Sequence, residues 1–275
     1  MTETEVQTEA LIAEGPVLVD LTGGVAHVRL NSPESSNGLD VPMLRALYEA
    51  LMLVHGERRA RAVLLSGEGR HFCAGGNVKV FASKGEGLPD YLREATSWLQ
   101  VCSGALMRLQ APVVCAVQGF AAGGGGMGLV CASDLVIAGR SAKFMLGATR
   151  VGMAPDGGGS VTLSALVGLR KAMEIALTNP TIDAEEAVRI GLITRVVEDD
   201  EVHAAARALA EELAQGPTLA LAATKRLLWD GLGSTVEARL PEEARTVSEL
   251  SGTADSLEGL AAVIERRSPT FTGRA

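Results

Sequence analysis

Two glycine-rich segments, about fifty residues apart, are the part of this sequence best suited to chemistry. The first, residues 71–79, reads HFCAGGNVK, and the second, residues 117–128, reads VQGFAAGGGGMG. Each follows an apolar, strand-like run, at residues 62–65 and 112–117. Two strand-to-helix turns of this kind can direct two backbone N–H groups at one point. Such a pair can hold an anion, or an oxygen that becomes an anion, without a charged side chain.

The composition indicates one large domain with an aliphatic core. The 275 residues are 47% hydrophobic but only 3% aromatic, so Ala, Val, Leu and Ile must fill the core. The formal net charge of −8 argues against a nucleic-acid partner. The four cysteines form no CxxC pair and predict reduced thiols and a cytoplasmic protein. No apolar run approaches the ~20 residues of a membrane span, and no residue cluster has metal-ligand spacing.

The predicted elements alternate between strands and helices and then become purely helical, which is typical of an α/β protein with an appended helical region. We expect residues 1–14 to be a flexible tail, 15–198 an α/β core and 199–275 a C-terminal helical region. About seventy helical residues have too little core to stand alone, so we expect this region to mediate oligomerisation.

Turn and capping signals define several of these elements more closely. Residues 17–31 predict a β-hairpin around Gly23-Gly24. Asp40 can cap a helix that extends to about residue 55. Residues 160–177 predict a helical region that is broken near Gly168. Lys225-Arg226 is expected to be a surface pair.

With these elements in order, the chain resembles the crotonase (enoyl-CoA hydratase/isomerase) superfamily over nearly its whole length. Five segments carry the resemblance, and no single one would suffice. They are FCAGGN at 72–77, the QG…G run at 118–126 leading to Ser133-Asp134, SAKF at 141–144, VGMAPDGGG at 151–159 and AVRIGLITRVV at 187–197.

The resemblance implies a spiral of ββα units, a C-terminal helical region, and assembly into trimers or dimers of trimers. It also implies an acyl-CoA substrate, with coenzyme A as part of the substrate and no separate cofactor. The thioester oxygen would accept hydrogen bonds from Gly76 and from a glycine of the second run. The second run holds one more glycine than the family pattern leads us to expect, so we assign this donor to Gly125, with Gly124 as the neighbouring possibility.

The acid and base side chains decide which reaction follows. Hydratases of this superfamily use two glutamates, and the corresponding positions here are Gly128 and Ala148, which cannot transfer protons. The remaining carboxylate is Asp156, at the position where the superfamily's isomerases place a single proton shuttle. The resemblance therefore favours an enoyl-CoA isomerase that moves a double bond from Δ3 to Δ2.

Other interpretations of Asp156 remain open. An aspartate before a glycine run is often only a helix N-cap. The chain could be an enoyl-CoA hydratase, or a non-catalytic acyl-CoA-binding homologue. Aryl-CoA dehalogenases resemble this segment too, but their tryptophan is replaced by Ala148 here and their histidine is missing.

The resemblance also assigns substrate contacts outside the proposed donors and base. Arg29 and Lys79 could meet the CoA phosphates, whereas His71 is expected to support a turn. The acyl pocket is expected to involve residues 80–99 and 144–153. The assigned contact residues are Arg29, Ala74, Asn77, Lys79, Gly124, Phe144 and Met153.

Overall fold

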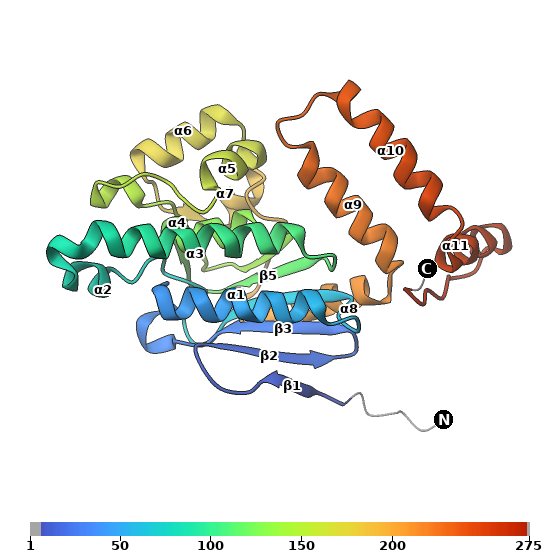
Figure 1. The fold of residues 1–275 in the computed structure, drawn as a ribbon, viewed down its shortest axis with the longest axis horizontal. Helices are drawn as coiled ribbons and strands as arrows, with labels where there is room; N and C mark the ends of the chain where they lie inside the picture. Colours follow the sequence, from blue (N-terminus) through green and yellow to red (C-terminus); the bar gives the residue numbers. More distant parts are fainter. Residues whose placement is uncertain (1–6, 274–275) are drawn as a thin grey trace.

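The structure, a computed structural model, describes residues 7–273, and a seven-stranded sheet organises its fold (Figure 1). The strands are β1 (Glu9–Ile12), β2 (Val17–Thr22), β3 (Val25–Leu30), β4 (Ala62–Gly67), β5 (Val113–Val117), β7 (Leu135–Gly139) and β10 (Arg195–Val197). Their spatial order is β1-β2-β3-β4-β5-β7-β10. The strands from β3 to β10 are parallel, and β1 and β2 add an antiparallel edge.

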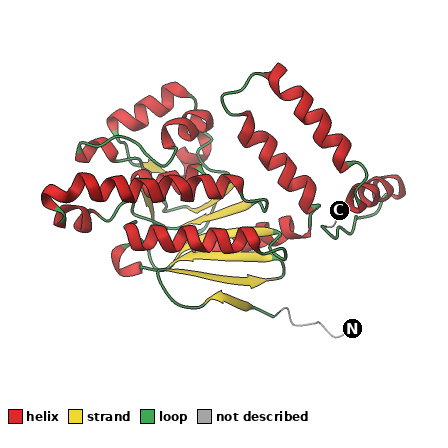
Figure 2. Ribbon diagram, in the orientation of Figure 1, coloured by secondary structure: helices red, strands yellow, loops and turns green. Residues whose placement is uncertain are grey.

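A second, small sheet and a set of helices complete the molecule (Figure 2). The small sheet contains β6 (Phe120–Ala122), β8 (Lys143–Met145) and β9 (Ile182–Asp183). The helices are α1 (Val41–Gly56), α2 (Val78–Ser83), α3 (Leu88–Arg108), α4 (Gly123–Cys131), α5 (Gly159–Val167), α6 (Leu169–Thr178), α7 (Ala184–Arg189), α8 (Val202–Gln215), α9 (Thr218–Gly231), α10 (Val236–Leu250) and α11 (Ala254–Glu265). No helix within residues 7–273 is both long and apolar enough to cross a membrane.

The central strands of the large sheet, β4 and β5, are buried on both faces, as parallel strands between two layers require. Along β3, Ala26 and Val28 face the main core, which contains residues of α1, α3 and α4. Val25 faces the opposite way, into a smaller core that α8 covers. Successive strand residues alternate between faces, so His27 and Arg29 share the face of Val25, and Leu30 shares the face of Ala26 and Val28.

Several local predictions are confirmed. The hairpin forms between β2 and β3. The Asp40 carboxylate accepts a hydrogen bond from Met43 N at 3.1 Å and caps α1. Gly168, at φ +78°, separates α5 from α6. The α/β architecture with a C-terminal helical region is therefore as the sequence indicated.

The expectation about the N-terminal end of the core is wrong. Residues 9–12 of the expected tail form β1 and pair with β2, whereas residues 1–6 lie outside the described part of the chain. The helical region expected from residue 199 is present, and its first helix, α8, packs directly on the sheet through Val202 and Ala206. The small sheet was not predicted, because strands of two or three residues are too short to show an alternation of apolar and polar residues.

Lys225 is buried, which corrects its assignment as half of a surface pair. Only 6% of the residue is exposed, and its Nζ lies 2.7 Å from Asp134 Oδ2 and 2.8 Å from the carbonyl oxygen of Leu106. Asp134 also accepts hydrogen bonds from Val113 N and Trp229 Nε1. This network fastens α9 to the end of α3 and to the start of β5. Burial lowers the pKa of Lys225, and Asp134 opposes that effect.

Replacing Lys225 by alanine should lower the free energy of unfolding by about 3–5 kcal/mol, because it leaves the Asp134 carboxylate without its buried counter-charge. Chemical denaturation measures the difference. The neighbouring Arg226→Ala is the matched control: its side chain is 50% exposed, and exposed pairs contribute only about 0–1 kcal/mol. Equal losses in the two variants would contradict the assigned role of Lys225.

Candidate active site

The two glycine-rich segments meet because β4 and β5 are adjacent and parallel. The first segment follows β4 and the second follows β5. Parallel neighbours end at the same edge of a sheet, where ligands of open α/β sheets bind. The segments then run side by side: Cys73 N donates to Phe120 O at 3.1 Å, and Ala122 N donates to Cys73 O at 2.9 Å.

The first segment leaves one backbone N–H free to face the second. Leu39 pairs with it on the other side, since Leu39 N donates to Gly75 O at 2.7 Å and Asn77 N donates to Leu39 O at 3.0 Å. Backbone groups alternate in direction along an extended chain, so the N–H of Gly76 faces away from Leu39. Within residues 7–273, it donates to no backbone acceptor.

The second segment supplies the N-terminus of α4. Gly123, Gly124 and Gly125 form its first turn, and the N–H groups of a first turn have no partner within the helix. The two segments approach so closely that a Cβ on Gly75 would lie 2.7 Å from Ala122 O. Gly75 and Gly123 also have φ values of +98° and +65°, which favour glycine. Glycine is therefore required at both positions.

A cavity of about 590 Å³ opens where the two segments meet. Its walls come from the first turn after β4, the N-terminus of α4, helices α2 and α3, and residues 145–156. The lining side chains are almost all apolar, and Thr96, Arg150 and Asp156 are the polar exceptions. Among these lining residues, Asp156 is the one carboxylate.

Asp156 lies directly beside the N-terminus of α4. A Cβ on Gly124 would be only 1.6 Å from Asp156 Oδ1, so the carboxylate occupies the space that any side chain at position 124 would need. Partial burial raises the pKa of Asp156 above its usual range, opposed by a hydrogen bond to the residue's own backbone. The N-cap of α5 is Gly158, and no side chain caps this helix. The N-cap interpretation of Asp156 therefore does not hold.

The cavity brings together six of the ten residues that the sequence analysis assigned to the site. These are Gly76, Gly124, Gly125, Asp156, Ala74 and Met153. The expected acyl-pocket segments also contribute, with Phe81, Leu92 and Leu99 from the earlier segment and Met145 and Val151 from the later one.

Two assigned contact residues lie outside this cavity. Phe144 is 0% exposed and points into the main core, whereas Met145, the next residue of β8, lines the cavity. Arg29 does not reach this cavity, because its side chain lies on the α8 face of the sheet and pairs with Asp20 and Glu68.

Asn77 and Lys79 do not line the cavity either. Asn77 caps α2 by accepting a hydrogen bond from Val80 N at 3.3 Å. Lys79 is exposed on the same helix, and its contact with a phosphate of the substrate remains a prediction. His71 supports the turn as expected, since its Nδ1 accepts a hydrogen bond from Phe120 N at 3.2 Å.

The sequence analysis missed lining residues that lie before or between the glycine-rich segments. Leu39 and Leu44 precede the first segment by about thirty residues. An apolar residue beside the Asp40 cap was the available signal, but it also fits an ordinary core position. Cys73 lies next to the site and is inert, because burial raises the pKa of its thiol to about 12.

The fold and this cavity define a member of the enoyl-CoA hydratase/isomerase family, to which the chain belongs. The family's model matches residues 20–274. The membership confirms the resemblance to the crotonase superfamily.

Individual relatives are similar over almost their full length. The chain is 42% identical to a probable enoyl-CoA hydratase of Rhodobacter capsulatus, covering 93% of this chain and 97% of that protein. It is 36% identical to the 1,2-epoxyphenylacetyl-CoA isomerase of Escherichia coli, covering 94% and 98%. The crystal structure of a putative enoyl-CoA hydratase from Streptomyces coelicolor superposes with a TM-score of 0.90 at 34% identity, covering 100% of both chains.

Gly124→Ala should reduce turnover of an enoyl-CoA thioester by about 10²-fold, because the new Cβ displaces the Asp156 carboxylate and small misplacements cost that much. Gly128→Ala is the matched control in the same helix. A Cβ there would meet Gly157 O at an ordinary 3.7 Å. The control should keep its activity and gain about 0.5–1 kcal/mol of stability. Steady-state kinetics and thermal unfolding test both variants, and full activity in Gly124→Ala would contradict the contact.

If Asp156 removes a proton, activity requires its ionised form. Burial raises its pKa above the ordinary value of 3.8, so kcat/KM should rise with pH through a midpoint above that value. A profile of kcat/KM against pH measures the midpoint. A midpoint at or below the ordinary value, or a flat profile across the acidic range, would argue against Asp156 as the base.

Proposed function

We propose that this protein is an enoyl-CoA isomerase that moves a double bond from Δ3 to Δ2, with Asp156 as its single proton shuttle. The observation that carries the proposal is the position of one raised-pKa carboxylate beside the N-terminus of α4, in a cavity whose other walls offer no second acid. An isomerase relative at 36% identity supports it.

The proposed reaction begins when the Asp156 carboxylate takes a proton from C2 of a 3-enoyl thioester. The electron pair of the C–H bond moves toward the thioester, and negative charge develops on its oxygen. The N–H of Gly76 and one N–H from the first turn of α4 would donate hydrogen bonds to that oxygen. The protonated Asp156 then returns the proton at C4, and the double bond is left between C2 and C3. The reaction consumes no water and no cofactor beyond the coenzyme A of the substrate.

The second donor is either Gly124 or Gly125, because both line the cavity. We favour Gly124 over the Gly125 of the sequence analysis. Gly124 contacts the carboxylate of Asp156, whereas a Cβ on Gly125 would point away from it, toward Leu39 Cδ1 at 2.5 Å. With the donor beside the base, the thioester oxygen can accept the hydrogen bond of Gly124 while C2 lies within reach of the Asp156 carboxylate.

Two other functions compete with this proposal. Hydration needs an acid and a base to add water, and α4 contains no carboxylate in any register while Ala148 occupies the other position. A non-catalytic acyl-CoA-binding role would leave the raised pKa of Asp156 without a purpose. The probable hydratase among the relatives keeps hydration as the activity to test against.

Turnover of a short 3-enoyl-CoA and a short 2-enoyl-CoA tests the proposal directly. We expect the absorbance of the conjugated thioester to rise with the 3-enoyl substrate and to stay constant with the 2-enoyl substrate. Asp156→Asn should lower kcat by ~10²–10⁴. Its thermal stability should not fall, because ionising an acid whose folded pKa is raised opposes folding at neutral pH.

Hydration of the 2-enoyl substrate would show that the protein is a hydratase and would overturn the isomerase proposal. Binding of both thioesters without turnover would show that it is a non-catalytic acyl-CoA-binding protein. Intact turnover in Asp156→Asn would leave the reaction but remove Asp156 from it.

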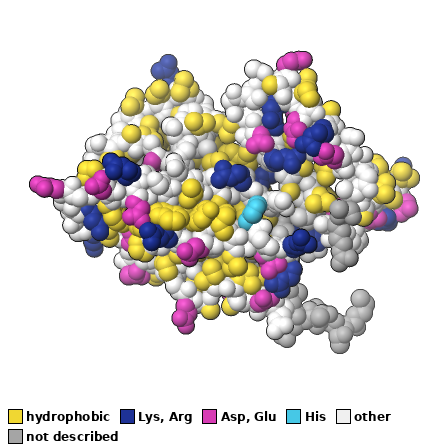
Figure 3. Space-filling model, viewed as in Figure 1, with side chains coloured by type: hydrophobic (Ala, Val, Ile, Leu, Met, Phe, Trp, Pro, Cys, Tyr) yellow, Lys and Arg dark blue, Asp and Glu magenta, His cyan; other side chains and the backbone are white. Residues whose placement is uncertain are grey.

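We also propose that the protein is a homotrimer or a dimer of trimers. Exposed apolar side chains are frequent on the C-terminal helices, and Figure 3 shows hydrophobic surface there and over α5 and α6. Examples are Leu228, Leu240, Val247, Leu260 and Ile264. Large exposed apolar patches are typical of subunit interfaces. Light scattering should give the mass of three or six chains, and the mass of one chain would contradict the assembly.

A further inference from the structure

A second cavity, of about 260 Å³, lies on the opposite face of the large sheet from the cavity that contains Asp156. Its walls come from the ends of β3 and β4 and from the first turns of α8. His27 and Arg29 share the face of β3 that carries Val25, which packs under α8. The lining residues are His27, Arg29, Leu64, Ser66, Gly67, Glu68, Gly69, His203 and Arg207. The proposed isomerase reaction uses none of them.

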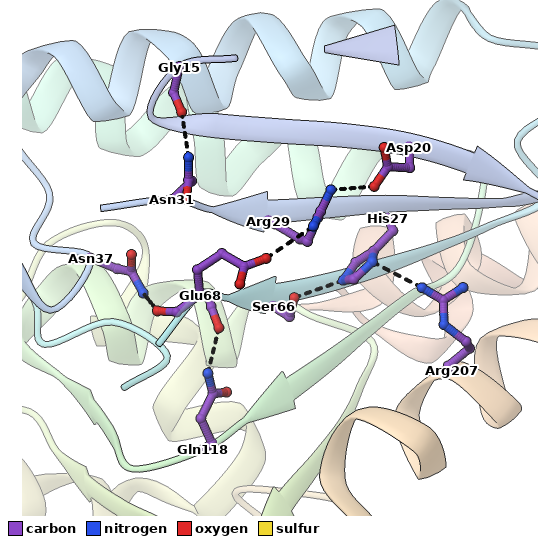
Figure 4. A network of polar contacts seen from close by, with 11 residues as sticks. Gly15, Asp20, His27, Arg29, Asn31, Asn37, Ser66, Glu68, Gln118 and Arg207 are labelled. Carbon is purple, nitrogen blue, oxygen red and sulfur yellow. Dashed lines mark hydrogen bonds and ion pairs between the residues drawn. The ribbon is translucent and has the colours of Figure 1, made fainter. Parts of the chain in front are cut away.

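A chain of hydrogen bonds fixes the state of His27 in this cavity (Figure 4). Arg207 Nη2 lies 3.1 Å from His27 Nδ1, and His27 Nε2 lies 2.8 Å from Ser66 Oγ. A guanidinium can only donate hydrogen bonds, so Nδ1 must accept and the ring proton must lie on Nε2. Burial, together with the charges of Arg207 and Arg29, lowers the pKa of His27 to about 3. The imidazole is therefore neutral and donates to Ser66.

The hydroxyl of Ser66 consequently has a proton to donate elsewhere. Its oxygen is the acceptor for His27, and the residue is only 2% exposed. The same protonation state excludes Ser66 as a nucleophile activated by His27, because Nε2 already carries a proton. The network therefore offers hydrogen-bond donors to the cavity. Its protonation state differs from that of a catalytic serine–histidine pair.

The charges of the cavity leave one cation without a carboxylate partner. Arg29 is paired with Asp20 and with Glu68, which is the one carboxylate that lines the cavity. Arg207 makes no ion pair with any residue from 7 to 273, and its recorded hydrogen bond is to a neutral imidazole. In addition, Arg29 Nε is buried without a hydrogen-bond partner in this part of the chain. A buried donor without an acceptor is costly.

We propose that this second cavity is a binding site for a phosphate group, with Arg207 and Ser66 as its principal donors. A phosphate oxyanion would accept hydrogen bonds from the guanidinium and the hydroxyl together, and its charge would neutralise the unpaired arginine. The volume lies below the roughly 300–1,000 Å³ of pockets for larger ligands. The site therefore takes inorganic phosphate, or the phosphoryl group of a molecule that otherwise remains outside the cavity.

Thermal unfolding in inorganic phosphate tests the site, with chloride added to hold the ionic strength constant. A ligand that binds only the folded state raises Tm with the logarithm of its concentration. We expect a rise on the order of 5 °C when phosphate exceeds its Kd about a hundredfold. Arg207→Gln should weaken phosphate binding about 10–100-fold. Arg170→Gln, on the exposed surface of α6, is the matched control and should respond as the wild type does.

Ser66→Ala provides a second variant if Arg207→Gln folds poorly, and it should also weaken phosphate binding. NMR of ¹⁵N-labelled histidine gives a readout independent of stability: phosphate should shift the resonances of His27 in the wild type but not in Arg207→Gln. A Tm that follows ionic strength alone would overturn the proposal. Equal phosphate affinity in Arg207→Gln and the wild type would overturn it as well.

Adenosine diphosphate distinguishes the two sources of the phosphate group. Binding that depends on Arg207 and is tighter than that of inorganic phosphate would show that the group arrives on a nucleotide. Arg207-dependent binding of inorganic phosphate without binding of the nucleotide would show that the ligand is the free ion.

Discussion

The close approach of two backbone turns is the constraint on which the rest of this structure depends. Gly75 and Gly123 lie against each other with no room for a side chain on either. Their positions follow from the adjacent parallel strands β4 and β5, which end at one edge of the sheet. Only this contact brings the N–H of Gly76 and the N-terminus of α4 to the same side of one cavity. The helices around the cavity supply its shape, but they could not supply this pair of donors.

The cavity also contains an acid, Asp156, whose surroundings differ from those of an ordinary exposed carboxylate. Asp156 fills the space left by the missing side chain of Gly124, so the carboxylate and the helix terminus share one small volume. Burial among the apolar walls raises the pKa of the acid. A shuttle that takes and returns one proton also needs a site with little competing water, whereas a hydratase needs a second acid that these walls lack.

The sequence predicted the parts of the site that depend on spacing along the chain. Gly76, the first turn of α4 and Asp156 each lie in one of the segments that carried the resemblance, and all three segments fall within the residues that the family's model matches. Phe144 was wrong because a strand of three residues gives no sign of which side faces the core. Arg29 lies outside the cavity, which the sequence could not show, because alternation along β3 fixes which residues share a face but cannot say which face holds the cavity. Its contact with a phosphate of the substrate stays a prediction. The burial of Lys225 was unreadable, since its partner Asp134 lies about ninety positions away in the sequence.

In the proposed site, the groups that would stabilise the charge on the thioester oxygen are all backbone N–H groups. No side chain can be removed to delete the N–H of Gly76 or of the first turn of α4, so a substitution at either place acts through the space that its added side chain takes and leaves the N–H itself in place. Neither donor titrates, so acid or alkali alters only the carboxylate. Substitutions in the apolar walls can accordingly change the acyl group that fits while leaving the machinery for enolate stabilisation intact.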